Sequence, residues 1–293
     1  MTTAASPRPN PLRAVFTKKK MFDTTLGNAL GLQVFRIVLA RMLLSLRRRS
    51  CPESTLPEAR HLAEEGYCVI ENYLSPEQFA AVRAEFDRAR EGNRFNVGAV
   101  DRENVVTDIV YLNWKDPGDY PAAVAAFRDN ERFLQILKGH EGRSGGALSA
   151  LGDVKSMLWC SYRVGDADGR EKLEVSNCDL HADTFHTITK GFLYLDDVDE
   201  HNGSHVYVPR SHRLSLGRLL FDYRNSVGEK FGAPRISEDG VRRMGLEPRR
   251  LCYPANTLII ANEQGFHARG RFDLGRKRDL IYFEYRSQPY RNG

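Results

Sequence analysis

The sequence predicts a mainly β protein with flanking helices, whose core is a double-stranded β-helix (a jelly roll) preceded by N-terminal helices. Short apolar runs recur after residue 155, and turn signals such as His201-Asn202-Gly203 and Pro254-Ala255-Asn256 separate them. Many short strands without long helices between them are typical of a barrel or two-sheet jelly roll. The expected strands are SMLWCSYRV, KGFLYLDDV, SHVYVP, NTLIIAN and DLIYFEYR.

The segment before these strands has helical signals. LPEARHLAEEG reads as a short helix that ends at Gly66, and YCVIENYL follows as a strand. A second helix begins with Ser75 as N-cap, and Gln78 completes a capping box. Residues 94–121 are polar and are expected to form an irregular loop beside a site. A further helix is expected over residues 122–138.

We expect two parts in the chain. Residues 1–50 contain ten Lys or Arg and one acid, a net charge of +9, whereas residues 51–293 contain 33 basic and 37 acidic side chains, a net charge of −4. Residues 51–293 are expected to be the enzymatic domain, with a partly helical insertion around residues 214–250. Because the basic charge is confined to the first part, a nucleic-acid partner is not expected.

The cysteines indicate the compartment. Their number is five, which is odd, and no two of them stand at CxxC spacing. This argues against a disulfide framework and against a zinc knuckle, and it favours a reducing compartment. We therefore expect a cytoplasmic protein.

The first fifty residues predict a basic arm, residues 1–20, and an amphipathic helix within residues 26–49. Arg36 and Arg41 interrupt its apolar run, which disfavours a membrane span. One broad helix face holds Leu32, Phe35, Leu39, Met42, Leu43 and Leu46. This face is expected either to contact the inner membrane surface peripherally or to dock on the protein's own core or a partner subunit.

A metal site is predicted from a His-x-Asp pair. His181 and Asp183 are two residues apart ahead of an apolar run, so on a strand they project to the same side. His267 follows the apolar run TLIIAN at the end of another expected strand. Two imidazoles and one carboxylate form a facial triad, which suits non-haem Fe(II) that must also bind a cosubstrate and O₂.

A 2-oxoglutarate cosubstrate would chelate the iron at one end and need a cation for its second carboxylate. Arg276 and Arg278 are available before the strand DLIYFEYR, and strand periodicity alone does not separate them. Lys190 and Thr187 lie close behind the metal pair and are tentative contacts of the cosubstrate. The other histidines of this region, His186, His201, His205 and His212, are expected at turns or rims.

The stretch HADTFHTITKGFLYLDDVDEHNGSHVYVPRSHR, with a distal His and a following Arg, resembles the phytanoyl-CoA dioxygenase-like Fe(II)/2-oxoglutarate oxygenases. The resemblance covers residues 58–290. It implies a cupin-like jelly-roll core, with His181, Asp183 and His267 as iron ligands. It also implies that Arg278, eleven residues after the distal His, binds 2-oxoglutarate, with Arg276 as runner-up. The family's usual Pro-Gly-Ser-His segment is Pro-Arg-Ser-His here, which changes the expected local turn.

The resemblance implies a dioxygenase that hydroxylates an unactivated C–H bond of a small-molecule or lipid-linked substrate, with release of succinate and CO₂. Related halogenases replace the metal-binding carboxylate with a small residue, so Asp183 favours hydroxylation, while desaturation stays open. The alternative is another jelly-roll metalloenzyme, such as a cupin-type isomerase or a dioxygenase independent of 2-oxoglutarate. That enzyme would keep the metal ligands but would not need the arginine.

Overall fold

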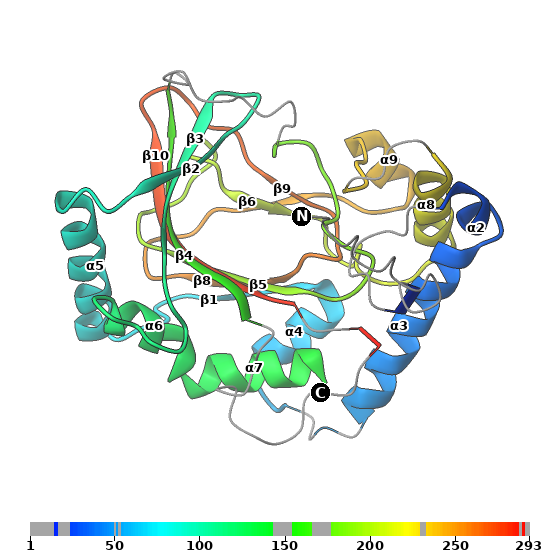
Figure 1. Ribbon diagram of the computed structural model, residues 1–293, viewed down its shortest axis with the longest axis horizontal. Coiled ribbons are helices and arrows are strands. Elements are labelled where there is room, and N and C mark those ends of the chain that lie inside the picture. Colours follow the sequence, from blue (N-terminus) through cyan, green and yellow to red (C-terminus); the bar gives the residue numbers. More distant parts are fainter. Residues whose placement is uncertain are drawn as a thin grey trace, which may run out of the picture.

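The computed structural model describes residues 15–16, 24–49, 51, 54–142, 154–165, 177–228, 233–286 and 289–290. The expected basic arm lies outside them, apart from Val15 and Phe16. Two antiparallel sheets form the core of the described part (Figure 1). A seven-stranded sheet has the order β1-β8-β5-β10-β4-β3-β2, and a three-stranded sheet has the order β7-β6-β9. This is the predicted jelly-roll class.

Each of the five expected strands is present. The large sheet contains β1 (Tyr67–Ile70), β2 (Asn96–Val100), β3 (Val105–Tyr111), β4 (Val154–Val164), β5 (Thr189–Tyr194), β8 (Leu258–Asn262) and β10 (Lys277–Tyr285). The small sheet contains β6 (His205–Tyr207), β7 (Arg249–Leu251) and β9 (His267–Arg269).

The expectation of an irregular loop over residues 94–121 is wrong, because β2 and β3 form there and extend one edge of the large sheet. The β-branched residues of VVTDIVY suit a strand. Strand β3 is next to the edge strand β2, and its central residues Thr107 to Ile109 are only partly buried, which fits the polar sequence.

The helices of the described part are α2 (Thr25–Ala29), α3 (Leu32–Arg49), α4 (Pro57–Glu65), α5 (Pro76–Glu91), α6 (Pro121–Arg128), α7 (Glu131–Glu141), α8 (Leu216–Val227) and α9 (Glu238–Arg243). The predicted capping box of Ser75 and Gln78 opens α5. The single helix expected over 122–138 is two helices, because the side chain of Asn130 caps α7 by accepting a hydrogen bond from the Phe133 amide (3.0 Å). Helices α8 and α9 lie in the predicted insertion.

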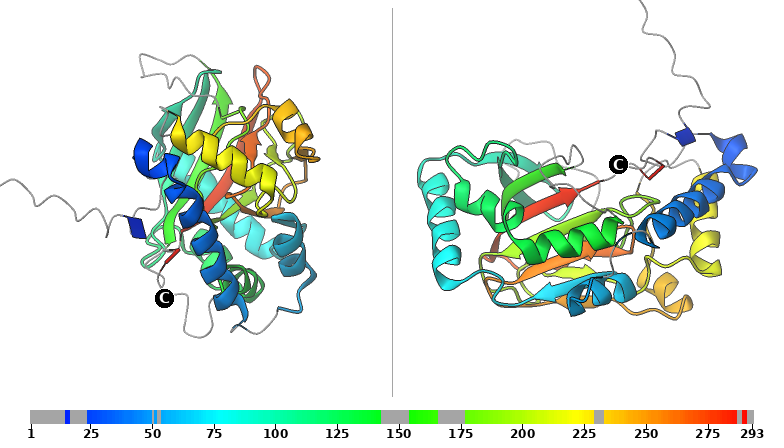
Figure 2. Two further views of the ribbon diagram at one scale, coloured as in Figure 1. Left: turned by 90° about the vertical axis from the view of Figure 1, so that its right-hand side faces the viewer. Right: turned by 90° about the horizontal axis from the view of Figure 1, so that it is seen from below.

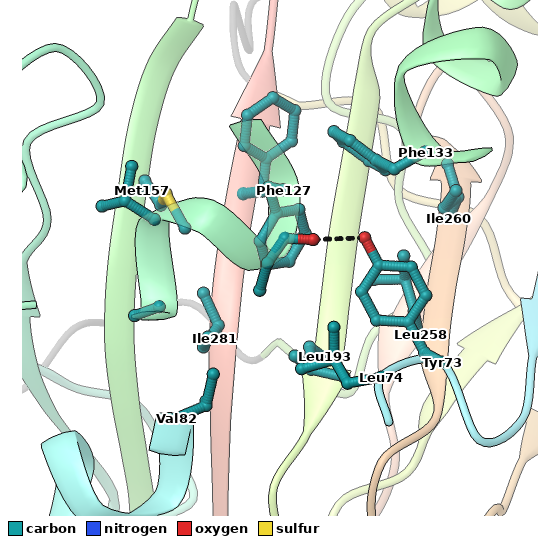
Figure 3. Close-up of a cluster of buried hydrophobic side chains, with 14 of the residues drawn as sticks. Tyr73, Leu74, Val82, Phe127, Phe133, Met157, Leu193, Leu258, Ile260 and Ile281 are labelled. Carbon is teal, nitrogen blue, oxygen red and sulfur yellow. Dashed lines mark hydrogen bonds between the residues drawn. The ribbon is translucent and has the colours of Figure 1, made fainter. Parts of the chain in front are cut away.

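The two faces of the large sheet have different partners. Helices α5, α6 and α7 pack on the outer face, where Phe127 lies parallel to Phe283 with ring centroids 5.5 Å apart. Figure 3 shows this cluster, in which the Tyr73 hydroxyl donates a hydrogen bond to the Ala126 carbonyl. The inner face carries aromatic side chains such as Phe192 and Tyr282, together with the candidate site.

Helix α3 packs on the body through the face opposite to the predicted one. Its buried residues are Gln33, Arg36, Ile37, Ala40 and Leu44. The Arg36 guanidinium lies 4.4 Å from the centre of the Phe185 ring and donates to the Gln33 side chain (2.8 Å). The prediction that the apolar face docks on the protein's own core is therefore wrong. The opposite face is buried instead, and there Arg36 stacks on Phe185 and is hydrogen-bonded to Gln33. Within the described residues, no helix is long and apolar enough to cross a membrane.

Candidate metal centre

Two chain segments bring the three predicted ligands together. His181 and Asp183 lie in the extended segment before β5, and His267 opens β9. The backbone amides of His181 and His267 each donate to the other residue's carbonyl at 2.9 Å, and this pairing sets their ring centroids 4.4 Å apart. The Asp183 amide donates to the Glu263 carbonyl (3.1 Å). The positions of the three ligands are thus fixed by main-chain hydrogen bonds.

The donor atoms suit one divalent cation. One ligand atom from each of His181, Asp183 and His267 lies within 4.8 Å of the other two. Asp183 Oδ1 is 3.6 Å from Nε2 of either histidine. The Nδ1 atoms of His181 and His267 lie 2.8 Å and 3.0 Å from the carbonyls of Asp179 and Gly265. With each Nδ1 donating there, Nε2 is the ring atom of each histidine that would bind a metal, and His267 would give up the proton that its Nε2 shares with Glu263. The residues present therefore fit a metal ion.

A second layer of charge surrounds the triad. The Lys190 ammonium donates to Asp183 Oδ2, so Oδ1 is the oxygen that faces the two imidazoles. Lys190 Nζ is also 3.7 Å from Glu263 Oε2. Glu263 in turn lies 2.6 Å from His267 Nε2 and 3.2 Å from His205 Nε2. These buried groups compensate one another's charge, which buried ions require.

The pKa values reflect this compensation. Burial, followed by the neighbouring His267, lowers the pKa of His181 to about 4. Burial would lower the pKa of His267 as well, but Glu263 and Asp183 raise it to about 9. Burial would raise the pKa of Asp183, yet the Lys190 ammonium and His267 outweigh it and hold that pKa well below its usual value. Asp183 is therefore a carboxylate in the folded protein.

The structure separates the two arginines that strand periodicity left open. Arg278 is buried in β10, where its guanidinium lies 4.6 Å from the centre of the Tyr162 ring and donates to the Gly203 carbonyl. Among the described residues it has no carboxylate partner, and its Nε has no hydrogen-bond acceptor. Arg276 is exposed and forms an ion pair with Asp199. A buried guanidinium without a counter-charge is suited to an anionic ligand.

Thr187 is directed elsewhere. Its hydroxyl lies 3.4 Å from Gln264 Oε1, and it lines a small cavity together with Ala40 and Arg41 of α3. His201 is exposed at a turn, as expected. We expected His186, His205 and His212 at turns or rims, where side chains are exposed. That expectation is wrong, because all three side chains are buried.

Sequence reasoning missed Glu263 and His205. Both are buried beside His267, Glu263 directly after β8 and His205 at the start of β6. A signal was available for each of them. Glu263 is an acid that follows the apolar run LIIA after a single Asn, and His205 shares strand parity with the buried Tyr207. A titratable side chain at an inward position of a buried strand indicates a site.

Comparison with known proteins identifies solved structures that share the fold. No protein-family model matches the sequence, and no curated protein matches it. Among solved structures, the chain is similar to the epimerase SnoN in complex with Fe³⁺, alpha-ketoglutarate and nogalamycin RO. The TM-score is 0.55 at 14% identity, over 79% of this chain and 85% of that chain. A second structure of SnoN, a non-haem alpha-ketoglutarate-dependent epimerase from nogalamycin biosynthesis, gives a TM-score of 0.51 at 13% identity, over 79% and 84% of the two chains.

Proposed function

We propose that this protein is an Fe(II)/2-oxoglutarate-dependent oxygenase of the phytanoyl-CoA dioxygenase-like kind. The observation that carries the proposal is the convergence of His181, Asp183 and His267, whose ligand atoms lie within 4.8 Å of one another. Two imidazoles and one carboxylate on one side of an ion leave its other positions open. The shared fold with SnoN supports the proposal.

The chain's residues have separate roles in this proposal. When bound, iron with 2-oxoglutarate and O₂ supplies the oxidation of an unactivated C–H bond, with release of succinate and CO₂. Lys190 holds one oxygen of Asp183, which leaves the other oxygen as the one that would hold the metal. Arg278, stacked on Tyr162, would hold the far carboxylate of 2-oxoglutarate.

Hydroxylation is the outcome that Asp183 favours, because a carboxylate ligand occupies the place that a halide would need. Both SnoN structures are of an epimerase, so the same fold also serves another outcome in that protein. For the substrate we propose a small or lipid-linked molecule and not nucleic acid, because residues 51–293 carry a net charge of −4.

One observation favours the alternative, a jelly-roll metalloenzyme that does not use 2-oxoglutarate. Glu263 and His205 place a second carboxylate and a third imidazole beside His267. If Glu263 became a metal ligand, fewer positions would be open for a bidentate cosubstrate. The two functions therefore differ in whether loaded iron binds 2-oxoglutarate.

The test is an anaerobic titration of the Fe(II)-loaded protein with 2-oxoglutarate, followed by its metal-to-ligand charge-transfer absorption. We expect a band in the wild type and a weakening of 2-oxoglutarate binding by a factor of about ten or more in Arg278→Ala, since a charge-assisted pair is lost. Arg276→Ala is the matched control and should bind as the wild type does. Iron that is fully bound but gives no band would favour the alternative function.

A further inference from the structure

An apolar face lies on the outside of the N-terminal helices. Exposed fractions are 54% for Phe35, 57% for Met42 and 55% for Leu46, all on α3. Helix α2 and the turn after it add Leu26 (74%) and Leu30 (81%). Five large apolar side chains exposed within 21 residues are more than the single exposed residues that are ordinary on protein surfaces.

Helix α8 extends this face. It packs against both α2 and α3, and the three helices lie together on one side of the molecule (Figure 2, left). Leu219 of α8 packs inward near Ile37 and Ala40, whereas Leu216 and Leu220 are 74% and 46% exposed. We call the exposed apolar residues of these segments the outer face. They are Leu26, Leu30, Phe35, Met42, Leu46, Leu216 and Leu220.

The charge around the outer face is positive. Residues 24–49 contain five arginines and no acid. The single acid of α8, Asp222, is buried and paired with Arg218 at 3.0 Å. The described residues of α2, α3 and α8 thus expose no carboxylate, while Arg49 and Arg224 are exposed. A second copy of this face would oppose cations to cations, so charge disfavours a dimer and favours an anionic partner.

A cationic cavity flanks the same helix. It has a volume of about 1020 Å³ and lies between α3, α4 and α7. Arg41, Arg48, Arg49 and Arg60 line it, and among its described lining residues Glu64 is the one acid. Exposed Ser45 and Arg49 of its lining lie on the side of α3 that adjoins Met42 and Leu46, so the cavity borders the outer face.

Among the described residues, the arginines that line the cavity form no ion pair. Arg48 donates to the His140 carbonyl (2.8 Å through Nε), and one terminal nitrogen of Arg41 is buried with no hydrogen-bond partner among the described residues. Burial, followed by Arg41, lowers the pKa of Arg48 to about 10, as expected where cations crowd. Guanidinium groups in this state are suited to phosphate oxygens.

We propose that the outer face seats the protein on a membrane that contains anionic phospholipid, with headgroup phosphates in the arginine cavity. Apolar side chains enter the interfacial layer, and arginines beside them contact the phosphates, as in helices that lie in a membrane surface. Both chemistries occur side by side on α3, which is why a phospholipid surface accounts for them together. The proposal does not depend on the metal centre.

The test is co-sedimentation of the full chain with two kinds of vesicle, phosphatidylcholine alone and a 7:3 mixture with phosphatidylglycerol. We expect binding to the anionic vesicles, weakened at higher salt. The triple variant Phe35→Ser, Met42→Ser, Leu46→Ser should bind at least about tenfold more weakly. Leu274→Ser is the matched control, because Leu274 is 85% exposed in the turn between β9 and β10, and it should bind normally.

A second pair of variants tests the charge. Arg49→Glu should weaken binding at least about fivefold, since each basic residue near an anionic surface contributes about that factor. Arg271→Glu, at an arginine whose side chain is 81% exposed outside these helices, should have no such effect. Equal sedimentation of the wild type and the triple variant would overturn the proposal. The proposal would also be overturned if light scattering showed a wild-type dimer that dissociates in the triple variant, while neither kind of vesicle binds the wild type.

Discussion

At the scale of single residues, the candidate centre depends on Lys190. Its ammonium contacts Asp183 and lies near Glu263, so it compensates a half-buried and a buried carboxylate at once. These contacts hold its pKa well above the usual value, although burial alone would lower it. Lys190 was expected as a tentative contact of the cosubstrate, and the structure places it against a metal ligand. Its role there is to position Asp183.

Replacement of Lys190 by Met leaves Asp183 free to rotate, and this loss of orientation is expected to outweigh the more negative charge of the site. We expect metal affinity to fall by a factor of about 10 to 100, the usual effect when a group that orients a ligand is lost. Isothermal titration with Mn²⁺ measures this. Lys115→Met, at an exposed loop position, is the control and should bind the metal normally. Unchanged affinity in the Lys190 variant would exclude the positioning role.

His212 gives a residue-scale prediction away from the metal. Burial, followed by the charge of Arg41, lowers its pKa to about 3, and its Nε2 lies 3.2 Å from the Ala63 carbonyl. The unfolded chain takes up this proton near pH 6.5, whereas the folded protein does not until about pH 3. The stability due to neutral His212 is therefore complete above pH 6.5 and is lost as the pH falls toward 3.

The free energy of unfolding should thus fall less between pH 7 and pH 5 in His212→Gln than in the wild type, by about 2 kcal/mol. Urea denaturation at the two pH values measures the difference. His201→Gln, at an exposed histidine, should keep the wild-type pH dependence. If the His212 variant also keeps it, the histidine is not held neutral in the fold.

At the scale of elements, Gly66 joins α4 to β1 under two constraints. Its φ of +89° is left-handed, and an added Cβ would lie 2.3 Å from the Tyr207 hydroxyl. That hydroxyl donates to the Asn262 carbonyl at the end of β8 (2.8 Å). Gly31, between α2 and α3, has a similar φ of +87° but nothing within 4 Å of the added Cβ. The two glycines therefore separate backbone strain from a steric clash.

Gly31→Ala should lower the free energy of unfolding by about 1 kcal/mol, the cost of left-handed backbone with a side chain. Gly66→Ala should lower it by about 3 kcal/mol, because the Tyr207 hydroxyl must also give up its buried hydrogen bond. Chemical denaturation of both variants gives the comparison. Equal losses would mean that Tyr207 and His212, whose Nδ1 lies 2.5 Å from the added Cβ, both move aside without cost.

At the scale of the whole molecule, alternation and turn signals predicted the jelly roll, and the His-x-Asp spacing placed two ligands on one side. Local patterns could not show which way α3 faces. Its apolar stripe predicted the buried side, but Arg36 is stacked on Phe185, a residue 149 positions away that no sequence pattern links to it. For the same reason His205 escaped prediction, since its meeting with His267 depends on the pairing of β6 with β9. Glu263 is only four residues before His267, but that spacing does not show that the turn after β8 brings the two side chains together.

The proposed function requires that His181, Asp183 and His267 alone hold a divalent cation, beside an arginine that binds the cosubstrate. Anomalous diffraction from crystals grown with Mn²⁺ and 2-oxoglutarate tests it most directly. The predicted result is one peak bonded to Nε2 of both histidines and to one Asp183 oxygen, with the far carboxylate of 2-oxoglutarate on Arg278. A peak bonded to Glu263 or His205, or a cosubstrate carboxylate remote from Arg278, would contradict the claim.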